Sequence, residues 1–225
     1  SVTNWFTAEG DASTLMTSTF NYGGTDPITN AATHDLVLNL STEGQTLERK
    51  LGSAANFVSE PVYVDTLIKF TASEDAPPAS DLTGAKAAVY VNASQSLVVY
   101  HGVAGGSPVM TDLGLTVDTN TWHRLTILLG YYKVVQTGEG TSKYPAFQLF
   151  IDNKVITNSV AYLGTYTDVM PETDVNGIWF KSAAGDGYET LSSVAFKGTG
   201  QVDDLWVSSW ASGLVPSTAV LLTLS

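Results

Sequence analysis

The chain has 225 residues, no cysteine, and a formal net charge of −12 from 22 acidic residues against 10 lysines and arginines. This length suits one sizeable domain, and the absence of cysteine excludes disulfides, thiol catalysis and cysteine-ligated metal centres. The acidic balance argues against nucleic acid or an anionic membrane as a partner, because both need a basic surface. No apolar run approaches the roughly 18 residues of a transmembrane helix. Without an initiator methionine or a leader segment, we expect a mature form or an excised fragment.

Strand-like segments recur along the chain, whereas helical periodicity is nearly absent. Each is an alternating or continuous apolar run bounded by Gly, Pro, Asn, Asp or Ser. Turns are expected at 92–95 and 152–153, where Asn and Asp tolerate positive φ. Many short strands without intervening helices predict an all-β fold, an antiparallel sandwich or barrel. In chain order the predicted strands are 35–40, 62–70, 87–91, 96–100, 123–129, 146–152, 154–156, 177–181, 192–196 and 202–207.

Three polar segments rich in Gly or Pro, 21–33, 72–83 and 136–145, are expected to be long loops. Binding sites concentrate in long loops, although plain surface insertions are the alternative. From Ala211 onward the chain loses aromatic and charged residues. We therefore assign 1–211 to the domain and 212–225 to a final strand or a linker into a further domain.

Three segments of the C-terminal half carry a resemblance to a known family. TWHRLTILL (121–129) is similar to a central strand that opens with Trp, one residue and Arg, and FQLFIDNKVI (147–156) to the hairpin that follows it. GQVDDLWV (200–207) is similar to a closing strand with paired acids. In order and spacing these segments resemble the concanavalin A-like, laminin-G-like jelly roll of bacterial extracellular proteins. The resemblance implies an antiparallel two-sheet β-sandwich with one concave sheet and loops along its rim.

Asp203 and Asp204 stand in the middle of an apolar strand, where an uncompensated buried carboxylate is very costly. Folds similar to this one often hold a structural calcium ion with a last-strand carboxylate and backbone carbonyls from the N-terminal segment and an early loop. Calcium takes about six to eight oxygen ligands, so the resemblance implies that one of these two residues ligates it. Strict alternation places Asp203 with Leu205 and Asp204 with Trp206, and a bulge would upset either assignment. Hydrogen bonds to backbone, serine or basic groups are the alternative.

Catalytic patterns known on such scaffolds are incomplete in this chain. Glycoside hydrolases need paired carboxylates, but only Glu172 and Asp174 match a Glu-x-Asp-x-Glu pattern, with Asn176 in the third position. None of the three histidines follows the Gln-x-His pattern of polysaccharide lyases, and His123 is expected to be structural. No Gly-x-Ser-x-Gly elbow or Walker spacing occurs. We predict no enzyme activity, with an unrecognised carbohydrate-active enzyme as the alternative.

Aromatic residues make up 10% of the chain and serve two predicted roles. We expect the core to contain Trp122, Phe150, Phe180, Phe196 and Trp206. Tyrosines near Gly, Asp, Asn or Thr suit a sugar ring, because a phenol buries apolar area while keeping a wet hydroxyl. The candidate ligand-binding residues are Tyr22, Tyr144, Tyr162, Tyr166 and Tyr188. The sequence thus predicts a monomeric, non-catalytic glycan-binding domain, extracellular or at a cell surface. Protein adhesion through the same loops, or a purely structural role, are the alternatives.

Overall fold

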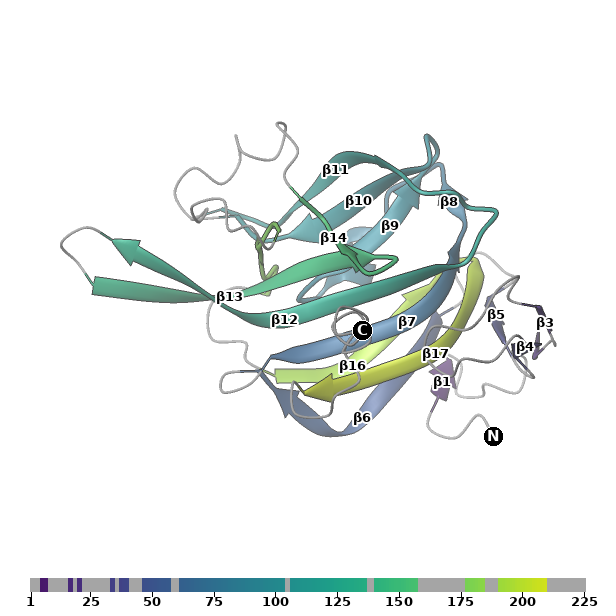
Figure 1. Ribbon diagram of the computed structural model, residues 1–225, viewed down its shortest axis with the longest axis horizontal. Helices are drawn as coiled ribbons and strands as arrows, with labels where there is room; N and C mark the ends of the chain where they lie inside the picture. Colours follow the sequence, from purple (N-terminus) through teal and green to yellow (C-terminus); the bar gives the residue numbers. More distant parts are fainter. Residues whose placement is uncertain are drawn as a thin grey trace, which may run out of the picture.

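The computed structural model describes residues 5–7, 16–17, 20–21, 33–34, 37–40, 46–57, 61–103, 106–136, 140–157, 177–184 and 190–209. They form two β-layers that face each other (Figure 1). Among the described residues, turns and one short 3₁₀ segment, η2 (Ala79–Leu82), connect the strands. This agrees with a sequence rich in β-branched and aromatic runs between turn residues.

The first layer is a large antiparallel sheet in the order β14-β13-β12-β7-β17-β5-β2, with β15 also paired to β13. Its central strands are β12 (His123–Gln136), β7 (Val62–Phe70) and β17 (Gly200–Ser209). The flanking strands are β13 (Gly140–Ile151), β14 (Lys154–Val155), β15 (Phe180–Lys181), β5 (Leu38–Leu40) and β2 (Met16–Thr17). Strands distant in sequence thus become neighbours at the centre of this sheet.

The second layer consists of two smaller sheets, β11-β10-β9-β8 and β1-β6-β16. In Figure 1, β6 and β16 lie behind β7 and β17. A separate two-stranded pairing joins β3 (Phe20–Asn21) and β4 (Thr33–His34). The strands of this layer are β8 (Ala72–Ser73), β9 (Ala88–Asn92), β10 (Ser96–His101), β11 (Val109–Thr116), β1 (Trp5–Thr7), β6 (Thr46–Asn56) and β16 (Thr190–Lys197).

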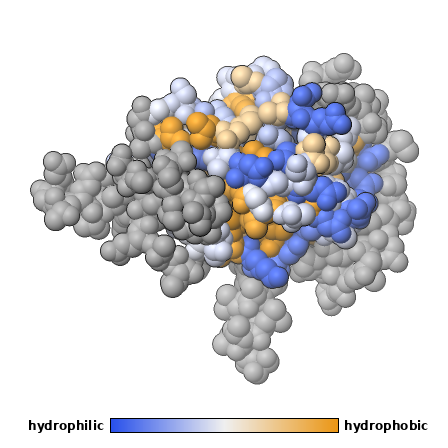
Figure 2. Space-filling view, turned by 90° about the horizontal axis from the view of Figure 1, so that it is seen from above, coloured by the Kyte–Doolittle hydropathy of each residue, from blue (hydrophilic) through white to orange (hydrophobic). Residues whose placement is uncertain are grey.

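The main core lies between the layers and follows the strand period of two. In β7, Val62 and Val64 face Leu97 and Val99 of β10 within one cluster of buried residues. Phe147 and Phe180 are fully buried in it, with stacked rings 5.2 Å apart. Seen from above, apolar residues in the middle of the described surface are bordered by hydrophilic ones (Figure 2).

The predicted strands and turns are largely confirmed. Residues 62–70 form a strand with the predicted bounds, and positive φ at Asp152 (51°) and Asn153 (64°) makes the predicted turn. The prediction of a long loop at 136–145 is wrong, because β12 continues to Gln136 and β13 begins at Gly140. Residues 131–136 pair with residues 140–145 in one continuous register, so inter-strand hydrogen bonds override the Gly-rich composition of this segment. Strand β6 escaped prediction because its sequence, TLERKLGSAAN, lacks clear alternation.

Candidate functional site

The large sheet has an outer face, turned away from the core, that carries polar and charged side chains on its central strands. In β7, Asp65 alternates with core-facing Val64 and buried Thr66. The cross-strand partners of Asp65 are Thr126 on β12 and Trp206 on β17. A cross-strand row on one face of the sheet therefore reads Trp206, Asp65, Thr126.

A β-bulge in β17 decides which of its side chains reach this outer face. Asp203 pairs with Leu67, and Trp206 pairs with Asp65, so Asp204 and Leu205 together oppose only Thr66. Asp204 has φ of 46°, the left-handed conformation that glycine usually supplies at such a bulge. The Thr66 hydroxyl donates a hydrogen bond to the Asp203 backbone oxygen (2.8 Å), and the Asp204 N–H donates to Asp203 Oδ1 (2.9 Å). The bulge interrupts the backbone hydrogen bonds between β17 and β7. These two bonds provide partners for the Asp203 carbonyl and the Asp204 N–H there.

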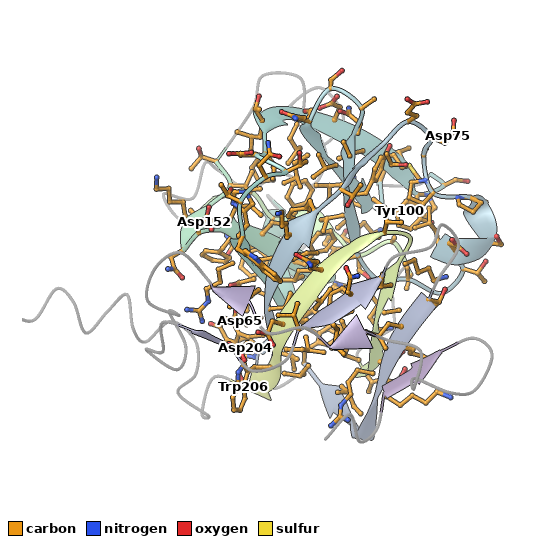
Figure 3. The ribbon with its side chains drawn as sticks, turned by 90° about the vertical axis from the view of Figure 1, so that its right-hand side faces the viewer. Asp65, Asp75, Tyr100, Asp152, Asp204 and Trp206 are labelled. Atoms are coloured by element: carbon orange, nitrogen blue, oxygen red, sulfur yellow. The ribbon has the colours of Figure 1, made fainter. Side chains whose placement is uncertain are left out.

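After the bulge, the side chains of β17 point to the opposite faces from those that strict alternation would give. Leu205 and Val207 pack against the core, whereas Asp203 and Trp206 lie on the outer face. Trp206 is 41% exposed, so the prediction that it belongs to the core is wrong. Strict alternation would have turned its side chain inward, and the extra residue at Asp204 turns it outward. Figure 3 shows Asp65, Asp204 and Trp206 close together beside β17.

A buried ion pair lies next to the exposed indole. Asp65 and Arg124 are each 3% exposed. Arg124 Nε donates to Asp65 Oδ1 (2.9 Å) and Oδ2 (3.0 Å), and Arg124 Nη2 contacts Asp65 Oδ2. The Thr126 hydroxyl adds a hydrogen bond to Asp65 Oδ1 (3.0 Å). These hydrogen bonds compensate the desolvation cost of the buried Asp65 carboxylate. Both of its oxygens therefore already have partners within the protein.

Tyr63 of β7 also lies on the outer face of the large sheet. Tyr63 pairs with Ser208 of β17 and is 3% exposed. Burial raises the pKa of the Tyr63 phenol to about 12. The side chain therefore stays a neutral hydroxyl at any physiological pH.

The two acids predicted to ligate calcium lie at the bulge. Asp203 Oδ2 and Asp204 Oδ2 are both shielded from solvent. This acidic, sheltered pair fits part of a calcium site. The described residues contain no group of three or more His, Asp or Glu that could hold a metal. Carbonyl ligands from the N-terminal segment and the early loop would lie mainly outside the described residues.

The structure places the other predicted residues as follows. Tyr144 lies in strand β13 and not in a loop; it is half-buried opposite Tyr132, and Lys181 Nζ lies 5.3 Å from the centre of its ring. Phe180 is in the core as predicted, whereas Trp122, Phe150 and Phe196 are half-buried. The other candidates fall outside the described residues: Tyr22, Tyr162, Tyr166, Tyr188, Glu172, Asp174, Asn176 and the segment 212–225.

Sequence reasoning missed Asp65 and Trp206 as residues of one surface. A carboxylate within VYVDTLIKF was a signal that a buried partner must exist, since such a group is costly alone. The partner could not be chosen, because Arg124 is 59 positions away in the chain. Only the pairing of β7 with β12 and β17 brings these residues together.

The comparisons with known proteins bear on the fold. No protein-family model matches the chain, and no curated protein matches it in sequence. Among solved structures, the T. cruzi calreticulin globular domain is similar over 95% of this chain and 87% of its own, with a TM-score of 0.50 and 11% sequence identity. The fold is thus a concanavalin A-like β-sandwich, which confirms the predicted antiparallel jelly roll. No helix among the described residues is long and apolar enough to cross a membrane.

Proposed function

We propose that this protein is a non-catalytic glycan-binding domain that binds neutral polysaccharide at the exposed part of β17, with Trp206 as the platform for a sugar ring. The observation that carries the proposal is the exposure of this indole, 41%, on a central strand. It is one of two large hydrophobic side chains exposed among the described residues, the other being Leu115. An aromatic ring offers a flat apolar surface that matches the apolar face of a sugar.

The backbone conformation of β17 supports a binding role for Trp206, because the bulge that exposes its ring contains a strained residue, Asp204. A non-glycine residue with positive φ costs about 1 kcal/mol or more, and Asp204 adopts φ of 46° two residues before Trp206. Such strain persists where surrounding structure enforces it, and it clusters at ligand sites. Without the bulge, Leu205 would face outward in place of the indole. A conformation that exposes Trp206 at the expense of backbone strain favours a binding role.

The surrounding charges favour a neutral ligand. Asp203 shares the outer face, and Asp65 is held by Arg124 and Thr126. Carboxylates repel uronates or sulfates, and the net charge of −12 acts in the same direction. We also propose an extracellular or cell-surface location and a bacterial source, as the family resemblance implies, and a monomeric state. Tyr22, Tyr162, Tyr166 and Tyr188 remain proposed additional contacts.

Affinity electrophoresis tests the proposal with laminarin and dextran as neutral polysaccharides and alginate as an acidic one. We expect retardation by at least one neutral polysaccharide, and a loss of at least about tenfold in affinity for Trp206→Ala, equivalent to about 1.4 kcal/mol. Leu115→Ala, on β11 of the other layer, is the matched control and should bind as the wild type does. A folded wild type that no glycan retards, or a Trp206→Ala variant of full affinity, would overturn the proposal and favour protein adhesion or a structural role. Assays for new reducing ends and unsaturated products test the absence of catalysis.

A further inference from the structure

His123, the first residue of β12, has a hydrogen-bond acceptor at each ring nitrogen. Its Nδ1 lies 2.8 Å from Asp152 Oδ2, and its Nε2 lies 2.8 Å from the backbone oxygen of Asp118. The residue is only 9% exposed, so water offers little substitute for these partners. A carboxylate and a carbonyl both accept, and only the imidazolium form has a proton on each nitrogen. The geometry therefore fits the cationic ring.

The Thr121 hydroxyl can act as a hydrogen-bond partner of His123 Nε2 when the ring is neutral. The Thr121 hydroxyl lies 3.1 Å from His123 Nε2 and 3.2 Å from the Asp118 backbone oxygen. A hydroxyl has one proton, so it donates to one of these atoms at a time. When Nε2 carries a proton, Thr121 can donate to Asp118. When Nε2 is bare, it accepts from Thr121 and loses its bond to Asp118.

These contacts join two connections at one end of the large sheet. Asp118 and Thr121 belong to the connection between β11 and β12. Asp152 begins the turn between β13 and β14, and its position is set independently of His123. Its Oδ1 accepts from the Arg124 N–H (2.9 Å), and its own N–H donates to the Arg124 carbonyl (2.9 Å). The turn is thus held in place without His123. The β11–β12 connection contacts the turn through His123 and is anchored elsewhere at Val117, whose N–H donates to the Gln95 carbonyl (2.8 Å).

We propose that His123 is a proton-controlled latch. In its cationic form it ties the β11–β12 connection to the fixed β13–β14 turn, and on losing the Nε2 proton it releases the Asp118 carbonyl and takes the Thr121 hydroxyl instead. The latch is separate from the proposed glycan surface and does not depend on it. It makes the local structure of residues 118–121 a function of pH.

The charges around His123 set the pH range of the latch. The Asp152 hydrogen bond raises the pKa of His123, burial lowers it, and the Asp118 carbonyl and the Asp152 and Asp118 charges raise it, with a net increase above 6.5. Lys154 and His123 are the cations acting on Asp152, and the Phe70 ring, 6.4 Å from the imidazole, adds no charge. A raised histidine pKa contributes stability below 6.5 that is lost as pH rises through the folded value. The latch is therefore closed below pH 6.5 and opens as the pH rises through the raised pKa of His123.

NMR titration of the full chain tests the latch. The His123 ring should titrate above 6.5, and the backbone amide shifts of residues 118–121 should follow with the same midpoint. Thr121→Val removes the donor that supports the neutral ring, so the midpoint should rise by roughly 0.5 unit, about threefold in proton affinity. Asp152→Asn removes the carboxylate and should lower it. Thr119→Val, in the same connection, is the matched control and should leave it unchanged.

Three results would each overturn the latch. The first is a His123 midpoint at or below 6.5 in the wild type. The second is a His123 midpoint that is the same in Thr121→Val as in the wild type. The third is that the amide shifts of residues 118–121 do not change with the His123 titration. Thr121 is exposed, so its substitution is compatible with folding and keeps the test decisive if Asp152→Asn destabilises the protein.

Discussion

Asp65 and Trp206 are cross-strand partners on the outer face of the large sheet, yet Asp65 is 3% exposed and Trp206 is 41% exposed. The carboxylate is enclosed by Arg124 and Thr126, which bond to it from β12. The indole sits on β17 beyond a bulge that turns it to solvent. One residue of the pair thus stabilises the sheet, while the other is available to a ligand.

The bulge residue Asp204 should tolerate glycine and reject a β-branched side chain. We expect Asp204→Gly to unfold at the same denaturant concentration as the wild type or higher, because glycine adopts φ of 46° without strain. Asp204→Val should lose about 1–2 kcal/mol of unfolding free energy. Urea unfolding with EGTA present separates this effect from any metal binding. Equal unfolding free energies for Asp204→Gly and Asp204→Val would show that residue 204 does not adopt the left-handed conformation.

Breaking the buried ion pair should be far more costly than replacing it. Asp65→Ala leaves Arg124 buried without its counter-charge, and we expect a loss of about 3–5 kcal/mol in unfolding free energy. The double variant Asp65→Leu/Arg124→Met should recover most of this loss, since apolar residues of similar volume need no compensation. Removal of the exposed Lys197–Asp81 pair by Lys197→Ala is the control and should cost less than about 1 kcal/mol. Additive losses in the double variant would contradict this account.

Calcium should stabilise the protein if one of Asp203 and Asp204 ligates it. An ion bound only to the folded state adds about 2.7 kcal/mol when its free concentration is a hundredfold above its dissociation constant. We therefore expect EGTA to lower the thermal midpoint and Asp203→Asn or Asp204→Asn to remove that sensitivity. A midpoint that chelation leaves unchanged in all three proteins would rule out the metal and leave hydrogen bonds as the compensation.

His101 should make the protein less stable in acid, in contrast to His123. Burial lowers the pKa of His101 below 6.5, although its bond to the Gly102 carbonyl raises it, and the ring is 0% exposed. Nδ1 lies 2.8 Å from that carbonyl and Nε2 lies 2.8 Å from the Thr111 hydroxyl, so the neutral ring satisfies both. The unfolded chain binds the extra proton, and stability falls as pH drops below 6.5 by at most about 1.4 kcal/mol per unit. Urea unfolding between pH 7 and 5 should show a steeper decline for the wild type than for His101→Gln.

The local sequence by itself determined the fold class and most strand positions. Runs such as VYVDTLIKF and SLVVYH carry the alternation and β-branched residues that favour strands, and β7 and β10 form there. Asp152–Asn153 makes the predicted turn because these residues tolerate positive φ. Such features depend on neighbouring residues only, so they can be read from a single chain.

The tertiary structure alone decided which side chains meet and which face solvent. The long β12–β13 hairpin exists because two Gly-containing segments pair with each other, and the Asp65–Arg124 pair joins strands that are distant in sequence. The exposure of Trp206 follows from one extra residue in β17, which becomes a bulge only because Thr66 of β7 accommodates it. Register and bulges arise from hydrogen bonds between strands, and a sequence pattern with a period of two contains no information about the partner strand.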